Sequence, residues 1–216
     1  MNSRVLSLIV GLGLVGCGEK ASEVKNAANA LEAAAGAGNA MAEAQKEAEK
    51  FSNDRKAKGD TVAMPYADLQ KMLPSAPSDY AAAEAPSGSS QSMGAFSMSQ
   101  AEQTFTKPAG PDGNVPTIHV AIMDFGGTQA GYGMVAAPMM MQMSQEDAHQ
   151  RMQTLKVNLP YTWGSEQYNK DDKSSTVTLI TRYRYLITVD ARNQGEDMSA
   201  MARSLAEDIA KKFDGK

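Results

Sequence analysis

The sequence predicts an α+β domain in which an antiparallel sheet packs against helices. Three strand-like segments follow one another between residues 161 and 190 without a helical pattern between them. Strands joined by such short turns pair antiparallel. The last twenty residues instead place apolar side chains at helical spacing. Only Phe51, of the thirteen aromatic residues, precedes Tyr66, so we expect the packed core after residue 64.

The first part of the expected domain, residues 65–114, combines one helix with one strand. Pro65 suits a first helical turn, Tyr66, Leu69, Met72 and Leu73 share one face, and Pro74 ends the helix. Residues 74–92 are predicted to form a long polar loop. Met93–Thr106 is predicted as an imperfect strand with a bulge near Ser99. The sequence KPAGPDGN at 107–114 is a turn cluster.

The middle of the domain contains a clear strand and a second predicted helix. In residues 115–125, Ile118, Val120 and Ile122 alternate with His119, Ala121 and Met123, which favours a strand covered in part on both faces. For residues 144–157 we predict a helix. Ser144 and Asp147 form a capping-box pattern, and Ala148, Met152 and Leu155 form the buried stripe, which leaves His149 at the surface.

The last part of the domain gives the strongest secondary-structure patterns. Residues 161–169, 175–181 and 184–190 are predicted strands. Acidic residues begin and basic residues end the closing helix, which suits the helix dipole. Its apolar face comprises Met198, Met201, Ala202, Leu205, Ile209 and Phe213.

An alanine-rich, charged block precedes this domain. Its composition favours helix but offers no core, and Gly36 and Gly38 interrupt the pattern. We interpret it as a semi-rigid helical tether, because a coiled coil would have a core made mostly of alanine. The predicted organisation is a leader at 1–16, a tether at 17–64 and an α+β domain at 65–216.

The stretch GLGLVGCGEK, residues 11–20, contains two motifs that point to different functions. Gly11, Gly13 and Gly16 match the G-x-G-x-x-G pattern of dinucleotide-binding loops. That pattern needs a βαβ unit, and no second hydrophobic strand lies between Cys17 and Phe51. Leu14 to Cys17 also match the box before a lipid-modified cysteine. The surroundings favour this second motif.

Residues 1–17 resemble the type II signal peptide of bacterial lipoproteins. Arg4 supplies the positive charge, residues 5–15 are apolar and too short to span a bilayer, and LVGC supplies the lipobox. The resemblance implies cleavage before Cys17, which receives a diacylglyceryl group and further acylation such as palmitate. Several acyl chains give a stable membrane anchor. Gly18, where an Asp would favour inner-membrane retention, implies the outer membrane in a Gram-negative cell.

Composition limits the expected partners. Net charge is −4, and loss of Arg4 with the leader makes it −5, which argues against nucleic acid. Cys17 is the only cysteine, so the mature domain is expected to have no disulfide and no thiol nucleophile. The element order resembles small α+β lipoprotein domains of the PsbP and Mog1 type, a resemblance that carries no site residues. We therefore expect a membrane-anchored, periplasm-facing cell-envelope lipoprotein with a non-enzymatic binding or structural domain and no cofactor. Its expected partners are the lipid bilayer and another envelope protein.

Two alternative functions rest on particular residues. The methionine-rich segment 134–152 offers soft thioether ligands for copper, with Met139, Met141 and Met143 in an M-x-M-x-M pattern. Methionine recurs throughout the chain, which favours apolar packing instead. Asp124 is the candidate for acid–base chemistry, since it ends a strand beside the glycine-rich loop at 126–133. We favour the interpretation that Asp124 caps the end of the strand. We also favour the interpretation that the loop is a flexible connection.

Overall fold

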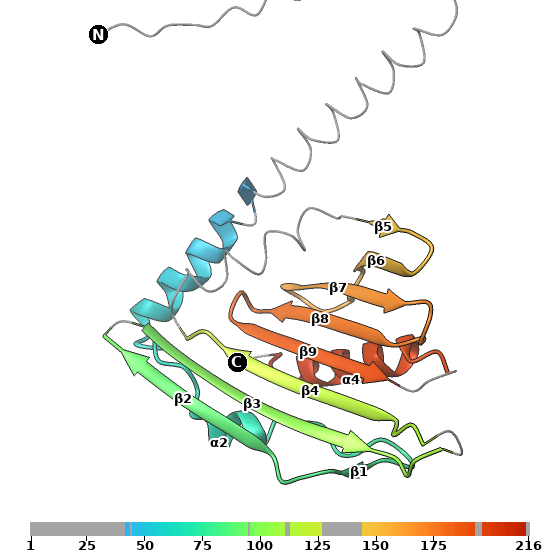
Figure 1. Ribbon diagram of the computed structural model, residues 1–216. Coiled ribbons are helices and arrows are strands. Elements are labelled where there is room, and N and C mark those ends of the chain that lie inside the picture. The colour runs from blue at the N-terminus through green and yellow to red at the C-terminus, as the bar shows by residue number, and fades with distance from the viewer. Residues whose placement is uncertain are drawn as a thin grey trace, which may run out of the picture. The chain divides into compact units, whose positions relative to one another are not determined.

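The computed structural model describes residues 42–43, 45–94, 96–110, 113–126, 144–192 and 196–214. These residues contain a nine-stranded antiparallel sheet in the order β1-β3-β4-β9-β8-β7-β6-β5, with β2 also paired to β3 (Figure 1). The α+β fold and its antiparallel sheet are therefore as predicted. The elements are α2 (Tyr66–Gln70), β1 (Ala81–Ala82), β2 (Ser87–Met93), β3 (Phe96–Thr106), β4 (Thr117–Asp124), β5 (Gln145–Glu146), β6 (Gln150–Leu155), β7 (Thr162–Asn169), β8 (Ser175–Thr181), β9 (Tyr185–Arg192) and α4 (Ser199–Lys211).

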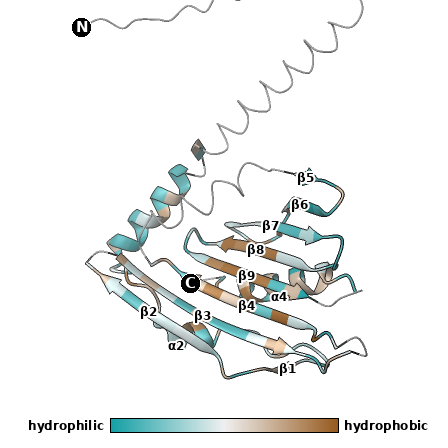
Figure 2. Cartoon of the chain, in the orientation of Figure 1, coloured by the Kyte–Doolittle hydropathy of each residue, from teal (hydrophilic) through white to brown (hydrophobic). Residues whose placement is uncertain are grey.

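The main core lies between one face of the sheet and the two helices α2 and α4. Every second residue of β3, β4 and β9 is buried, which is the period-two pattern of strands with one covered face. Figure 2 shows the hydrophobic residues concentrated in the central strands β4, β8 and β9. Fully buried side chains in this core include Leu69, Ile118, Val120, Ile122, Val177, Leu179, Ile187, Val189, Ile209 and Phe213.

The opposite face carries the N-terminal helix, residues 45–57, at one end of the sheet. Ala48 is buried there with Ile180 and Tyr183, and Phe51, Trp163 and Leu186 pack around them. The compact unit accordingly runs from Asn39 to Lys216 rather than from residue 65. The predicted boundary at residue 64 placed this helix in the tether, because a single aromatic residue in 17–64 gave no sign of a core. Its aromatic residue, Phe51, contacts Tyr161, just before β7, and Tyr183, in the turn between β8 and β9.

The helix predicted at 144–157 is wrong. This segment forms the short strands β5 and β6, and His149 lies in the turn between them. The Asp147 carboxylate accepts hydrogen bonds from the backbone N–H of His149 and Gln150 at 2.8 Å each, which closes a turn where the pattern indicated a helix cap. Pairing of β6 with β7 outweighs local helix propensity.

The long loop predicted at 74–92 is wrong in its last part, and the bulge predicted near Ser99 is also wrong. Residues 87–93 form β2, which pairs with β3 without interruption from Met93–Phe96 to Ser87–Glu102. Gly94, with φ of +60°, makes the tight turn that separates the two strands. Glycine and serine have low strand propensity, so β2 owes its conformation to β3 and α2. A Cβ on Gly88 would lie 2.7 Å from the Gln100 carbonyl oxygen and 3.0 Å from Tyr66.

Candidate functional site

The turn between β8 and β9 is the most unusual backbone in the described structure. Arg182 and Tyr183 both have positive φ, at 57° and 52°, although neither is glycine. Tyr161, with φ of 52°, accepts a hydrogen bond from the backbone N–H of Arg182 at 2.8 Å. A left-handed conformation costs a non-glycine residue about 1–3 kcal/mol and persists only where surrounding contacts hold it. Positive φ at both Arg182 and Tyr183 is the geometry of a type I′ hairpin turn, here built without glycine and bonded to Tyr161.

Three consecutive residues of this turn bind the segment that precedes the sheet. The Arg182 carbonyl accepts a hydrogen bond from Arg55 Nη1 at 3.1 Å. The Tyr183 hydroxyl donates to Glu47 at 2.6 Å. Arg184 Nη1 donates to both carboxylate oxygens of Asp60, at 2.9 and 2.8 Å. The turn is therefore the place where the N-terminal helix and its linker are fastened to the domain.

Arg184 is the centre of this attachment, which we call the junction. Its Nε and Nη2 donate to Asp124 at 2.6 and 2.9 Å, and Nη2 also donates to the Val62 carbonyl at 3.0 Å. With the two bonds to Asp60, all five guanidinium donors have an acceptor. Burial alone would lower the pKa of Arg184, but the hydrogen bonds and charge of Asp124 outweigh it and raise the pKa. Arg184 is thus a permanent cation in a closed set of partners.

Asp124, at the end of β4, has no exposed surface and four hydrogen-bond donors. Two come from Arg184, and the others are the backbone N–H groups of Met64 at 2.7 Å and Gly126 at 2.8 Å. Both carboxylate oxygens are therefore occupied by groups of the protein. This geometry fits the strand-end cap that the sequence favoured, and it leaves Asp124 no access to a substrate.

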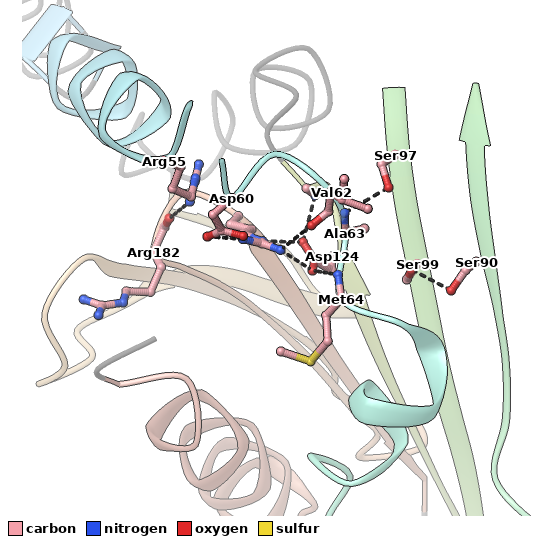
Figure 3. A network of polar contacts seen from close by, with 12 residues as sticks. Arg55, Asp60, Val62, Ala63, Met64, Ser90, Ser97, Ser99, Asp124 and Arg182 are labelled. Atoms are coloured by element: carbon pink, nitrogen blue, oxygen red, sulfur yellow. Dashed lines mark hydrogen bonds and ion pairs between the residues drawn. The ribbon is translucent and has the colours of Figure 1, made fainter. Parts of the chain in front are cut away.

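The linker at 60–64 completes the junction, as Figure 3 shows. The backbone N–H of Ala63 donates to the Ser97 hydroxyl at 2.9 Å, which ties the linker to the start of β3. Gly126, with φ of +58°, lies so close that a Cβ there would be 2.9 Å from the Ala63 nitrogen. The first glycine of the glycine-rich loop is therefore required for packing against the linker. Residues 127–133 of that loop lie outside the described residues.

Aromatic rings supply the apolar part of the attachment. The Phe51 ring lies 4.6 Å from Tyr161 and 5.3 Å from Tyr183, and Trp163 lies 4.6 Å from Tyr183, all between ring centroids. Such pairs add about 0.5–1.5 kcal/mol each beyond the area they bury. The sequence alone does not distinguish whether Tyr161 and Trp163 belong to the core or to a contact surface. In the structure they are the surface on which the N-terminal helix lies.

The remaining predicted candidates are not brought together. His119 lies on β4, 3.2 Å from the Thr104 hydroxyl, and faces a hollow of about 240 Å³ bordered by residues 83–87 and β3. His149 lies in the turn between β5 and β6, at the opposite edge of the sheet, and its ring nitrogen Nδ1 is 3.0 Å from the Asp171 carboxylate. In the part of the chain that the structure describes, no group of three His, Cys, Asp or Glu residues is placed to hold a metal. Cys17, Met139, Met141 and Met143 lie outside that part.

Sequence reasoning found Asp124 but missed its partners. Arg184 and Asp60 are charged residues in a predicted strand and a predicted tether, where a solvated position is the ordinary expectation. The adjacent Arg182-Tyr183-Arg184 triplet gave no recognisable motif. Within the described residues, no helix has the length and hydrophobicity needed to cross a bilayer. No known protein family, curated protein or solved structure matches the chain.

Proposed function

We propose that this protein is a lipid-anchored lipoprotein of the bacterial cell envelope whose domain is a non-enzymatic binding or structural module. The observation that carries the proposal is the sequence Leu14-Val15-Gly16-Cys17 after a short apolar segment with Arg4 before it. Cys17, the sole cysteine, is the acylated residue, and the lipid bilayer is the first partner. The outer membrane is the proposed destination in a Gram-negative cell.

The junction gives this proposal a physical consequence, because it determines how far the domain reaches from its anchor. A free chain from residue 18 to 64 would extend to at most ~160 Å. With the helix at 45–57 and the linker at 60–64 fastened to the sheet, only residues 18–41 remain between the anchor and the domain, and they extend to at most ~80 Å. The contacts of Arg184 and Phe51 therefore halve the maximum reach.

The same contacts support a binding or structural role for the domain. Asp124, the carboxylate best placed by sequence for acid–base chemistry, is saturated by hydrogen bonds from Arg184, Met64 and Gly126. A group engaged in this way positions other parts of a protein rather than exchanging protons with a substrate. The attachment site holds a membrane-proximal segment in one orientation, which is what a tethered binding module requires.

The test is the intact mass of the chain isolated from membranes, with fractionation of two variants. We expect a chain that begins at Cys17 and carries the added mass of acyl groups. Cys17→Ser should abolish the added mass and release the protein from the membrane. Gly16→Ala is the matched control, since it keeps a small residue before the cysteine and should leave both mass and location unchanged. An unmodified chain that retains residues 1–16 in the soluble fraction would overturn the proposal.

A further inference from the structure

The outer edge of β2 offers unused backbone hydrogen-bonding groups. Among the described strands, β2 pairs only with β3. The two-residue turn at Gly94 makes Met93–Phe96 a hydrogen-bonded pair, and hydrogen-bonded and non-hydrogen-bonded pairs alternate along an antiparallel ladder. Gly88, Ser90 and Ser92 therefore direct their N–H and C=O groups away from β3. A strand of seven residues with such an edge is a template for a further strand.

This edge lacks the features that usually prevent strand addition. Residues 85–101 contain no charged side chain, and β2 contains neither proline nor a bulge. The opposite edge of the sheet differs, because β5 has only two residues and one of them, Glu146, is bound to Lys170 at 2.8 Å. Short length and charge protect β5, whereas β2 is long and neutral.

Exposed apolar side chains border the same edge. Of the large hydrophobic residues exposed in the described structure, Tyr66 and Met93 lie at this edge and are 43% and 79% exposed. Met93 ends β2, and the backbone N–H of Tyr66 donates to the Ser90 hydroxyl at 3.0 Å. Apolar surface beside an open edge is typical of an interface.

We propose that β2 pairs antiparallel with β2 of a second copy of this chain. A two-fold axis at Ser90 pairs Ser90 with its counterpart and Gly88 with Ser92, so each outward backbone group finds a partner in about six hydrogen bonds. Each copy has a net charge of −4, and the uncharged hairpin at 85–101 is a surface at which two copies meet without placing like charges directly opposite each other. Five of the seven residues of β2 are serine or glycine, which lets identical strands approach without a clash. One strand pair with a few apolar neighbours makes a small interface, so the dimer is weak.

The first test is sedimentation of the full chain in detergent, from micromolar to near-millimolar concentration. We expect a concentration-dependent dimer. Ser92→Pro removes an N–H that faces outward and leaves the ladder to β3 intact, so it should abolish the dimer without loss of the folded state. Ser92→Thr keeps that N–H and should still dimerise. A wild-type chain that is monomeric throughout the range would overturn the proposal.

Cross-linking gives a second test that does not depend on how well Ser92→Pro folds. Gln91→Cys on β2 and Gln145→Cys on β5 are treated in membranes with a short bis-maleimide, and the chain with Cys17 alone is the control. We expect a dimer band for Gln91→Cys well above both of the others. Equal bands at the two edges would show that copies meet without using β2, and would also overturn the proposal.

Discussion

In the part of the chain that the structure describes, two carboxylates are fully buried, and each is bound by an arginine that fastens a helical segment to the sheet. Asp124 binds Arg184, which is 5% exposed and belongs to the junction with the N-terminal segment. Glu166 binds Arg203 of α4, whose side chain is 37% exposed. The helix α4 also buries Ala202, Ile209 and Phe213 in the main core, whereas the apolar side chains that the N-terminal segment fully buries are the small ones of Ala48 and Ala63, and Phe51 is half-buried. Glu166 therefore supplements a large apolar contact, while Asp124 and Arg184 supplement a smaller one and carry a larger share of the attachment.

The largest expected effect is that of Arg184→Met. It leaves the Asp124 carboxylate buried without its cation, and breaking a buried pair in this way costs about 3–5 kcal/mol. Urea unfolding of the full chain measures the loss. Arg192→Met is the matched control, because Arg192 pairs with Asp190 at the surface and is 68% exposed, so the loss should stay below about 1 kcal/mol.

A second variant sharpens this result. Removing both charges, in Arg184→Met combined with Asp124→Leu, eliminates the uncompensated carboxylate and should recover part of the stability lost in Arg184→Met. If Arg184→Met unfolds at the same urea concentration as Arg192→Met, the junction contributes no more than a surface ion pair, and the contrast with Glu166 disappears.

Arg203→Met should have a smaller effect than Arg184→Met. Glu166 keeps hydrogen bonds from Gln153 at 2.7 Å and from Ser175 at 3.0 Å, and α4 stays packed on β8 and β9. Loss of one hydrogen-bonded charge partner then costs about 1.5–3 kcal/mol. The same urea measurement applies, with Lys211→Met as the control for an exposed pair on the same helix. A loss equal to that of Arg184→Met would mean that the two carboxylates are equivalent.

Acid should weaken the attachment of α4 through Glu166. Burial alone would raise the pKa of the Glu166 carboxyl, but hydrogen bonds from Arg203, Gln153 and Ser175 outweigh it and hold the pKa below its usual value. The stability that this carboxylate provides is therefore complete above its unfolded-state pKa of about 4.3 and is lost as pH falls through the lower folded-state pKa. In Glu166→Gln, the free energy of unfolding should fall less steeply below pH 4 than in the wild type. An unchanged slope would contradict this assignment.

Sequence patterns predicted the parts of the fold that are specified by side-chain periodicity. The alternation of Ile118, Val120 and Ile122 located β4, and the apolar face from Ala202 to Phe213 located α4. For residues 144–157 the sequence predicts a helix, because Ser144 and Asp147 match a capping-box pattern. The segment forms β5 and β6 because β6 pairs with β7, a contact that the local pattern does not encode. The serine-rich β2 has no periodicity to recognise. Asp124 was identified from its place after a strand, but its contact with Arg184 joins residues sixty positions apart, which local patterns do not encode.

The smallest expected effect on stability is that of Arg55→Met, within the same junction. Burial and the nearby charge of Arg184 both lower the pKa of Arg55, so this side chain occupies an unfavourable position for a cation. Methionine keeps the apolar stem and removes the repulsion, at the loss of one hydrogen bond to the Arg182 carbonyl. We expect a change in the free energy of unfolding within about 1 kcal/mol.

Phe51→Ala is the informative contrast to Arg55→Met. It removes the ring that contacts Tyr161 and Tyr183, so backbone hydrogen exchange in residues 45–57 should lose its protection while β4 and β9 keep theirs. Arg55→Met should leave the protection of the same helix unchanged. If Phe51→Ala leaves the hydrogen-exchange protection of this helix as unchanged as Arg55→Met does, the helix is held by polar contacts alone. Arg55→Met could instead loosen the helix more than Phe51→Ala does. The charge of Arg55 would then stabilise the attachment, because the carboxylate of Asp60 offsets the repulsion between Arg55 and Arg184.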